Sequence, residues 1–264
     1  MIVIERPWGQ TKPPVGYGLD WGDPINTGVL LRSLFNVSGV VNPDLSGKHI
    51  PFTSRIVTPP LVSTSYGKAT RNINSYDEQW LGQNIGDPTN AGFALWMKAT
   101  GWAGANDILW SNGSTSGDGY SFFWWTTNGK LGILAGGVGG SHFGVDHDTN
   151  YHFYVVNKFG NVFYLYIDGA YRGTCTQAYN AVSTAQFQVG NGYSVSTVER
   201  DIHQIFARNV PFSAGEIKRL YAEPFAGIQQ CKIYIPYAAA AAGGTFNPYF
   251  YHQYIAGGMH GESA

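Results

Sequence analysis

Residues 161–173, NVFYLYIDGAYRG, constrain the fold of this chain more than any other stretch. Large apolar and aromatic side chains occupy both parities of the run, and successive side chains of a strand point to opposite faces. A strand formed here therefore has one face in a core and a second face that packed material must cover. The dipeptide Asp168-Gly169 favours the positive φ angles of a two-residue turn. The sequence thus predicts a β-hairpin with two apolar faces.

Similar runs elsewhere predict an all-β domain. Asn128-Gly129 separates two strand-like runs and predicts a second hairpin with a two-residue turn. Further strand candidates are FALWMKA, YHFYVV and AQFQVG. Aromatic residues make up 15% of the 264 residues and glycine contributes 35, a composition typical of turn-rich β structure. We therefore expect a two-sheet antiparallel jelly-roll sandwich.

The hydrophobic period changes in SAGEIKRLYAEP, where a helix is predicted. Ser213 and Glu216 match a capping box, and Pro224 ends the run. The apolar stripe of this helix consists of Ile217, Leu220 and Tyr221. We expect one short helix at the C-terminal end of the sandwich.

Both ends of the chain differ in composition from its centre. We expect an extended arm over residues 1–24, the sandwich over 25–223, and a C-terminal arm rich in aromatic, alanine and glycine residues over 224–264. Burying the aromatic side chains of the last arm does not compensate for the entropy of ordering its backbone. The arms therefore either wrap their own sandwich or lie on another subunit, and we favour the second. The predicted partner-binding residues of the arms are Trp8, Tyr17, Trp21, Tyr237, Phe246, Tyr249, Phe250, Tyr251 and Tyr254.

Several runs occur in the order seen in laminin-G-like domains of the concanavalin A-like lectin/glucanase group. They are GVLLRSLFNVSG, PDLSGKHIPFT, GFALWMKAT, DTNYHFYVV, VFYLYIDGAYRG, FQVGNG and DIHQIFARNVPFSAGEIKRLYA. The resemblance covers residues 25–223, although Tyr151-His152 stands where that family has Trp-His. It implies a concanavalin A-like sandwich, which hosts sugar binders, adhesion modules, glucanases and structural proteins of tailed phages alike.

Glucanases on this sandwich resemble one another in a Glu-x-Asp-x-x-Glu strand motif that supplies a nucleophile and an acid. The run ERDIHQ is similar, with Glu199 and Asp201 in the first two positions, but Gln204 occupies the third. An amide has no proton to give to a leaving group. We therefore interpret the two acids as loop or edge charges, and we expect no enzyme activity.

Sugar binding needs aromatic faces on an exposed surface. The run SFFWW places Phe122 and Trp124 on one face of a strand and Phe123 and Trp125 on the other, so one pair lies outside the core. A sugar, a terminal arm, a second subunit or another strand layer would cover that pair. The candidate sugar-binding residues are Trp102, Trp110 and Trp125, with burial in the core or an interface as the alternative.

Asp146 and Asp148 in VDHDTN suit the demand of calcium for oxygen ligands, and a polar turn explains the same residues. No other cofactor is expected. Two cysteines, Cys175 and Cys231, are too few for a disulfide framework and leave a single bridge open. We expect both thiols to be free and buried.

Charge and hydropathy limit the partners and the location. Charged residues make up 12% of the chain and give a net charge of -1, which argues against nucleic acid as a partner. The start MIVIERPWG lacks the pattern of a signal peptide. The run IYIPYAAAAAGG is interrupted by Pro236 and is too short for a membrane span.

These observations predict a non-enzymatic structural protein of a phage particle, made in the host cytoplasm and located in the virion. It would be a decoration, cement or tail-associated subunit whose terminal arms attach to the major capsid protein or to copies of itself. A lectin-like carbohydrate-binding adhesion module, with a cell-surface glycan as its partner, is the alternative. A glycoside hydrolase is the least favoured class.

Overall fold

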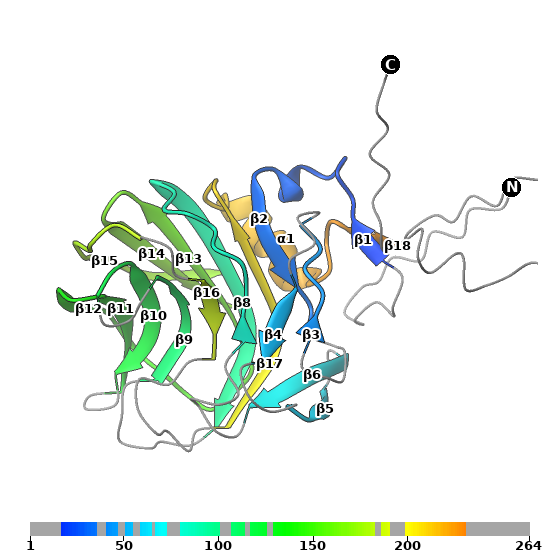
Figure 1. Ribbon diagram of the computed structural model, residues 1–264, viewed down its shortest axis with the longest axis horizontal. Coiled ribbons are helices and arrows are strands. Elements are labelled where there is room, and N and C mark those ends of the chain that lie inside the picture. Colours follow the sequence, from blue (N-terminus) through cyan, green and yellow to red (C-terminus); the bar gives the residue numbers. More distant parts are fainter. Residues whose placement is uncertain are drawn as a thin grey trace, which may run out of the picture. The chain divides into compact units, whose positions relative to one another are not determined.

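A computed structural model shows two antiparallel sheets packed face to face, with one short helix on the outer side of one sheet (Figure 1). The predicted all-β sandwich is confirmed. The structure describes residues 17–35, 41–46, 51–54, 59–64, 67–72, 80–100, 107–113, 117–125, 129–182, 186–190 and 199–230. No helix in these ranges has the length and hydropathy to cross a membrane.

Sheet 1 has eight strands in the order β12-β11-β10-β9-β16-β7-β4-β3. Their bounds are β12 (Gly139–Asp146), β11 (Lys130–Ala135), β10 (Tyr120–Trp125), β9 (Asp107–Asn112), β16 (Phe187–Val189), β7 (Trp80–Leu81), β4 (Phe52–Ser54) and β3 (Val41–Asn42). All of their pairings are antiparallel.

Sheet 2 has the order β15-β14-β13-β8-β17-β6-β5, and β2 pairs with β17 beside this path. The bounds are β15 (Ala170–Thr176), β14 (Val162–Ile167), β13 (His152–Phe159), β8 (Asn90–Thr100), β17 (Glu199–Arg208), β6 (Gly67–Asn72), β5 (Leu61–Thr64) and β2 (Val29–Ser33). A separate two-stranded sheet pairs β1 (Tyr17–Leu19) with β18 (Ile228–Gln230).

The core between the two sheets is rich in aromatic rings. Trp110 on β9 stacks on Phe93 of β8, with ring centroids 4.3 Å apart. Phe187 on β16 lies 5.8 Å from Trp110. All three side chains are fully buried. Strands of both sheets therefore contribute every second side chain to one core.

Strand β10 carries aromatic side chains on both of its faces. Phe122 and Trp124 belong to the core between the sheets. Phe123 and Trp125, of the opposite parity, lie on the outer face of sheet 1 with their rings 5.2 Å apart. The predicted division of SFFWW between two faces is therefore confirmed.

The two predicted hairpins differ in their turns. Ile167 pairs with Ala170, and Asp168 and Gly169 between them have φ angles of 52° and 79°, which confirms the two-residue turn. In the other hairpin, Trp125 pairs with Lys130. That hairpin is confirmed, but its predicted two-residue turn is wrong, because four residues separate the strands.

Helix α1 (Ala214–Ala222) begins at the predicted capping box. The Ser213 hydroxyl accepts a hydrogen bond from the Glu216 backbone amide, and the Glu216 carboxylate accepts one from the Ser213 amide. Ile217 and Leu220 are buried, whereas Tyr221 is 45% exposed. The buried stripe is thus narrower than the sequence predicts.

Residues on both sides of the predicted sandwich pack against it. The compact unit that contains both sheets ends at Gln230. Phe225 and Ile228 are buried in it, and β1 pairs with β18. Residues 17–24 and 224–230, which the sequence places in the arms, therefore pack on the chain's own sandwich.

The predicted arm contacts fall into two groups. Tyr17 lies in β1. Trp21 lies between β1 and the short 3-10 helix η1 (Pro24–Asn26) and is 62% exposed. Cys175 is a free, buried thiol, as predicted, and burial raises its pKa to about 12. The other residues named for the arms and the second cysteine lie outside the described residues: Trp8, Cys231, Tyr237, Phe246, Tyr249, Phe250, Tyr251 and Tyr254.

Candidate functional site

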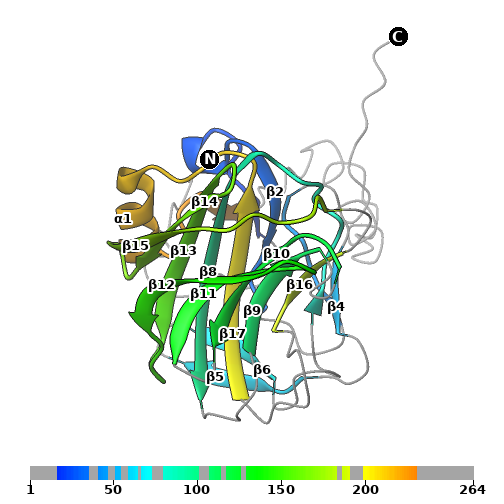
Figure 2. The same ribbon diagram turned by 90° about the vertical axis from the view of Figure 1, so that its left-hand side faces the viewer.

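The outer face of sheet 2 is divided into a covered half and an open half. Side chains of α1 and of residues 209–213 pack on β8, β13 and β17, and Figure 2 shows α1 to one side of the sheets. Beneath them, Trp96 and Phe153 stack with ring centroids 3.7 Å apart, and Phe206 is also buried. The second apolar face of these strands is therefore covered by the chain itself.

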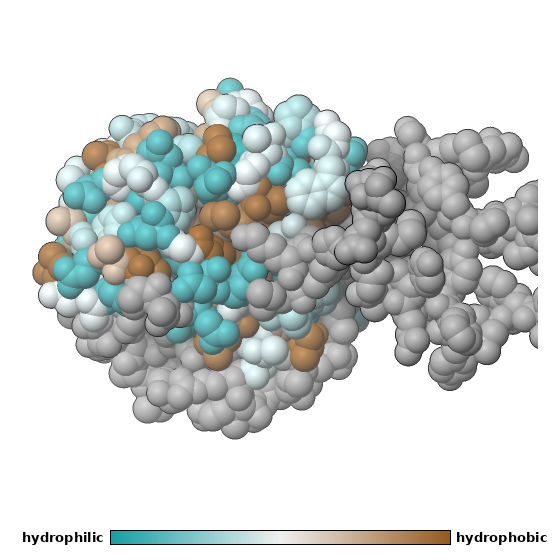
Figure 3. All heavy atoms as spheres, turned by 45° about the horizontal axis from the view of Figure 1, so that its top comes forward, coloured by the Kyte–Doolittle hydropathy of each residue, from teal (hydrophilic) through white to brown (hydrophobic). Residues whose placement is uncertain are grey.

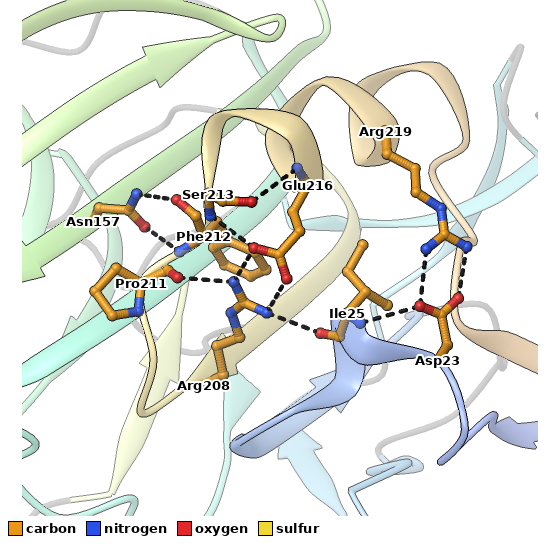
Figure 4. Close-up of polar contacts among 9 residues, drawn as sticks. All are labelled: Asp23, Ile25, Asn157, Arg208, Pro211, Phe212, Ser213, Glu216 and Arg219. Carbon is orange, nitrogen blue, oxygen red and sulfur yellow. Dashed lines mark hydrogen bonds and ion pairs between the residues drawn. The ribbon is translucent and has the colours of Figure 1, made fainter.

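Buried polar contacts fix this cover to the sheet (Figure 4). Arg208 donates to both carboxylate oxygens of Glu216 at 2.7 Å and to the Pro211 carbonyl oxygen at 2.9 Å. Burial opposes ionisation of Glu216, but the hydrogen bonds from Arg208 and Ser213 outweigh it and lower the pKa of this carboxyl. The first turn of α1 is thus tied to β17.

Two further contacts hold the ends of the cover. The Asn157 amide donates to the Phe212 carbonyl and accepts from the Phe212 amide, at 2.7 and 2.9 Å. Arg219 donates to both carboxylate oxygens of Asp23 at 2.8 and 2.6 Å (Figure 4). The position of Tyr221 on α1 is therefore fixed relative to β13.

The open half of the face is formed by β14 and β15 at the edge of sheet 2. Side chains of β14 alternate between buried and half-buried, so Phe163 and Leu165 face the core while Tyr164 and Tyr166 face outward. Tyr171 on β15 is 56% exposed. We call five residues the tyrosine surface: Phe159, Tyr164, Tyr166, Tyr171 and Tyr221.

Four rings of the tyrosine surface contact one another in two pairs. Phe159 and Tyr164 meet edge to face, with centroids 5.6 Å apart, and Tyr166 and Tyr171 do the same at 5.5 Å. Burial raises the pKa of Tyr166, and the nearby Tyr171 and Tyr164 phenols add to the shift. Tyr221 lies against the hairpin turn, because a Cβ placed on Gly169 would be 3.4 Å from its ring. The surface therefore offers neutral phenols beside partly exposed ring faces.

A histidine fixes the hairpin turn at the end of this surface. His152 Nδ1 lies 2.6 Å from an Asp168 carboxylate oxygen, and its Nε2 lies 2.9 Å from Asp148. The other Asp168 oxygen accepts from the Phe153 amide at 2.9 Å. The hydrogen bond with Asp168 raises the pKa of His152 despite its partial burial. The turn is thus held by a side chain that favours its protonated form.

The three candidate tryptophans have different outcomes. Trp110 is fully buried in the core, where its ring contacts Phe93 and Phe187, so it offers no exposed face to a ligand. Trp125 is half-buried on the outer face of sheet 1, 4.5 Å from the His142 ring. It remains a candidate. Trp102 lies outside the described residues.

The candidate calcium residues have protein partners. Asp146 forms an ion pair with Lys130 at 2.6 Å. Asp148 accepts from the Asn150 amide at 2.7 Å as well as contacting His152. Within the described residues, no group of three or more His, Cys, Asp or Glu side chains could hold a metal ion. The geometry fits the alternative interpretation of a polar turn.

The two acids of ERDIHQ also have protein partners. Arg71 donates to both oxygens of Asp201 at 2.6 and 2.8 Å, and the Tyr151 hydroxyl donates to the same carboxylate at 2.9 Å. Glu199 lies 3.7 Å from Arg71. Gln204 donates to the Pro224 carbonyl oxygen at 2.8 Å. Both acids lie in β17, which pairs with β8 on one side and β6 on the other, so their interpretation as loop or edge charges is wrong.

The sequence analysis does not identify the tyrosine surface as a site. The signal is present in NVFYLYIDGAYRG, where tyrosine fills the second parity of β14. The pattern shows that this face needs a cover, but it does not show which of its residues α1 buries. That information depends on tertiary packing.

Comparisons with known proteins identify the fold. No protein-family model matches the chain, and no curated protein matches it. Among solved structures, the chain is similar to the binding domain of botulinum neurotoxin DC in complex with SialylT, with a TM-score of 0.58 at 11% identity. It is also similar to the binding domain of Paraclostridial mosquitocidal protein 1, with a TM-score of 0.59 at 12% identity. A third neighbour is the Trypanosoma rangeli sialidase, with a TM-score of 0.55 at 13% identity.

Each alignment covers about three quarters of this chain and a smaller share of its neighbour. The coverage is 75% of this chain and 52% of the botulinum domain, 76% and 53% for the mosquitocidal protein, and 75% and 33% for the sialidase. The chain therefore spans about half, or a third, of these structures. At such low identities, the likeness shows a shared sandwich fold.

Proposed function

We propose that the chain is a non-enzymatic carbohydrate-binding module that holds a glycan against the tyrosine surface. The observation that carries this proposal is the set of partly exposed rings on β13, β14 and β15, which contact in the pairs Phe159–Tyr164 and Tyr166–Tyr171. A pyranose ring has an apolar C–H face and a rim of hydroxyl groups. Tyrosine matches both, since its ring packs against the apolar face and its phenol exchanges hydrogen bonds with the rim.

The tyrosine surface is partly polar, because each of its four tyrosines carries a hydroxyl group beside an apolar ring. On the face drawn in Figure 3, strongly hydrophobic residues appear as separate brown groups among teal and white ones. Tyrosine surfaces of this kind are partly polar, and exposed aromatic patches mark binding sites. The hairpin that carries the rings is rigid, because Asp168 is held by His152 and Phe153.

The structural neighbours support a glycan ligand. One of them was solved in complex with SialylT, and another is a sialidase. Because this chain spans only part of each, their ligands and activity enter here only as part of the proposal. The absence of catalysis is likewise proposed, since Asp201 is tied to Arg71 and Tyr151.

The predicted role in a virus particle rests on other residues. It depends on contacts by residues 1–16 and 231–264, which lie outside the described residues. None of the three neighbours above is a virion protein. We therefore place glycan binding ahead of attachment to a major capsid protein or to copies of this chain.

A glycan array with the full chain tests the proposal. We expect binding to a defined set of glycans, and a loss of at least about tenfold in the variant Tyr164→Ala/Tyr171→Ala, because stacking contacts dominate such sites. Val138→Ala is the matched control, since Val138 is exposed on the turn between β11 and β12. Its binding should equal that of the wild type.

Two outcomes contradict this assignment. If the array shows no glycan bound by the wild type, the proposed function is wrong. If Trp125→Ala abolishes binding and the tyrosine variant retains it, the glycan lies on the outer face of sheet 1 instead.

A further inference from the structure

We infer that the ligand of the tyrosine surface is an acidic glycan, in which a sugar ring bears a carboxylate that Arg172 binds. This inference rests on the proposed function and adds the chemical class of the sugar. Three observations carry it: Arg172 directly follows Tyr171, its guanidinium has no partner among the described residues, and it occupies a β-bulge in β15.

Arg172 occupies a β-bulge. Tyr166 pairs with Tyr171 and Leu165 pairs with Gly173, so Arg172 is an extra residue in β15. Bulges redirect side chains and are frequent beside binding sites. The Arg172 side chain is exposed and directly follows Tyr171 in the chain. In the part of the chain that the structure describes, its guanidinium forms no hydrogen bond or ion pair.

The acids around the tyrosine surface already have cationic partners. Each carboxylate lies within 4 Å of a basic side chain: Asp148 and Asp168 of His152, Glu216 of Arg208, and Asp23 and Glu223 of Arg219. Arg172 has no such partner among the described residues. Within those residues, Arg172 is therefore a cation without a carboxylate partner that directly follows Tyr171 in the chain.

A second cation lies on the α1 side of the surface. Lys218 is exposed, and it precedes Tyr221 by three positions, which places both on one side of the helix. Within the described ranges, Lys218 also has no hydrogen bond or ion pair. Arg172 and Lys218 are therefore two exposed cations without a carboxylate partner in these ranges, one on β15 and one on α1.

These features fit a carboxylated sugar better than other anions. A guanidinium binds a carboxylate through two parallel hydrogen bonds, and a sugar that bears the carboxylate can stack on a ring next to it. Sialic acids and uronic acids share this chemistry. Nucleic acid requires several phosphate contacts from clustered basic residues, and two cations do not supply them.

Matched glycans measure the contribution of the carboxylate. The dissociation constant is determined by calorimetry for sialyllactose against lactose, and for a glucuronic-acid disaccharide against its glucose counterpart. We expect the wild-type chain to bind at least one acidic glycan about tenfold more tightly than its neutral counterpart, a difference that shrinks as salt rises. The acidic glycan that binds shows whether the carboxylate belongs to a sialic acid or to a uronic acid.

The variant Arg172→Gln tests whether Arg172 causes the preference for the acidic glycan. We expect this variant to bind the acidic and the neutral glycan with equal affinity, while its melting temperature stays unchanged because the side chain is exposed. Lys68→Gln removes a positive charge from β6, several strands away, and should keep the full preference. Lys218→Gln should reduce the preference by less than Arg172→Gln.

The outcomes separate this inference from the proposed function. Equal wild-type affinity for acidic and neutral glycans overturns the inference and leaves a glycan-binding module. A preference that survives in Arg172→Gln overturns the role of Arg172. Failure to bind any of the four glycans overturns the inference for these sugars, and the array then decides the proposed function separately.

Discussion

The covered and open halves of sheet 2 have the same kind of strand with different aromatic residues. Under α1, the outward side chains include Trp96 and Phe206, and both are buried. On the open half, the outward positions of β14 and β15 hold Tyr164, Tyr166 and Tyr171. A phenol keeps its hydroxyl in water while its ring lies on the sheet, whereas phenylalanine has no such group. The residue type therefore separates a face that is closed by packing from one that remains available for binding.

The largest expected difference between the halves is in stability. Trp96→Ala should lower the free energy of unfolding by about 3–5 kcal/mol, because it leaves a cavity under α1. Tyr171→Ala, on the open half, should change it by less than about 0.5 kcal/mol. Urea denaturation of both variants measures the contrast. Equal losses would show that the open tyrosines belong to the core and would remove the distinction between the halves.

The cover itself should depend on its buried ion pair. Glu216→Ala leaves the Arg208 side chain, which is only 2% exposed, without a countercharge. We expect a loss of about 3 kcal/mol, the usual effect of removing one partner of a buried pair. Glu223→Ala is the control, since Glu223 is exposed at the end of the same helix. A similar small effect for both variants would mean that α1 is held by apolar packing alone.

The open half should respond to pH through its hairpin turn. Because the folded state raises the pKa of His152, the stabilisation is fully present below the ordinary histidine pKa of about 6.5 and is lost as pH rises through the raised value. His152→Gln should therefore cost about 1 kcal/mol at pH 5.5, and less at pH 9. Unfolding by urea at the two pH values tests this. An equal cost at both would show that the contacts with Asp148 and Asp168 do not depend on protonation.

Local chemistry predicts the parts of this fold that depend on neighbouring residues. Asp168-Gly169 gives the two-residue turn because both residues adopt positive φ, and Ser213 with Glu216 starts the helix. The pairing of β1 with β18 joins opposite ends of the described chain, so no local pattern indicates it. This pairing joins residues that the sequence assigns to the two arms.

The site is less predictable than the fold. Strand parity shows that two aromatic sets on one strand face opposite ways, but it does not show which set enters the core. Trp110 is a large aromatic near a polar loop in the sequence, and it is buried because β9 turns it toward Phe93. The extent of the tyrosine surface depends on where α1 lies on sheet 2, which Arg208, Asn157 and Asp23 fix through their contacts with Glu216, Phe212 and Arg219.

The most direct test of glycan binding at the open half is an NMR titration that follows the aromatic ring signals. Wild-type chain with labelled tyrosine and tryptophan is titrated with the tightest ligand from the array. We expect shifts in the rings of Tyr164, Tyr166 and Tyr171, while the Trp96 ring under α1 and the Trp125 ring on sheet 1 stay unchanged. Saturating shifts confined to Trp125, or no ring shifts at full occupancy, would contradict the assignment.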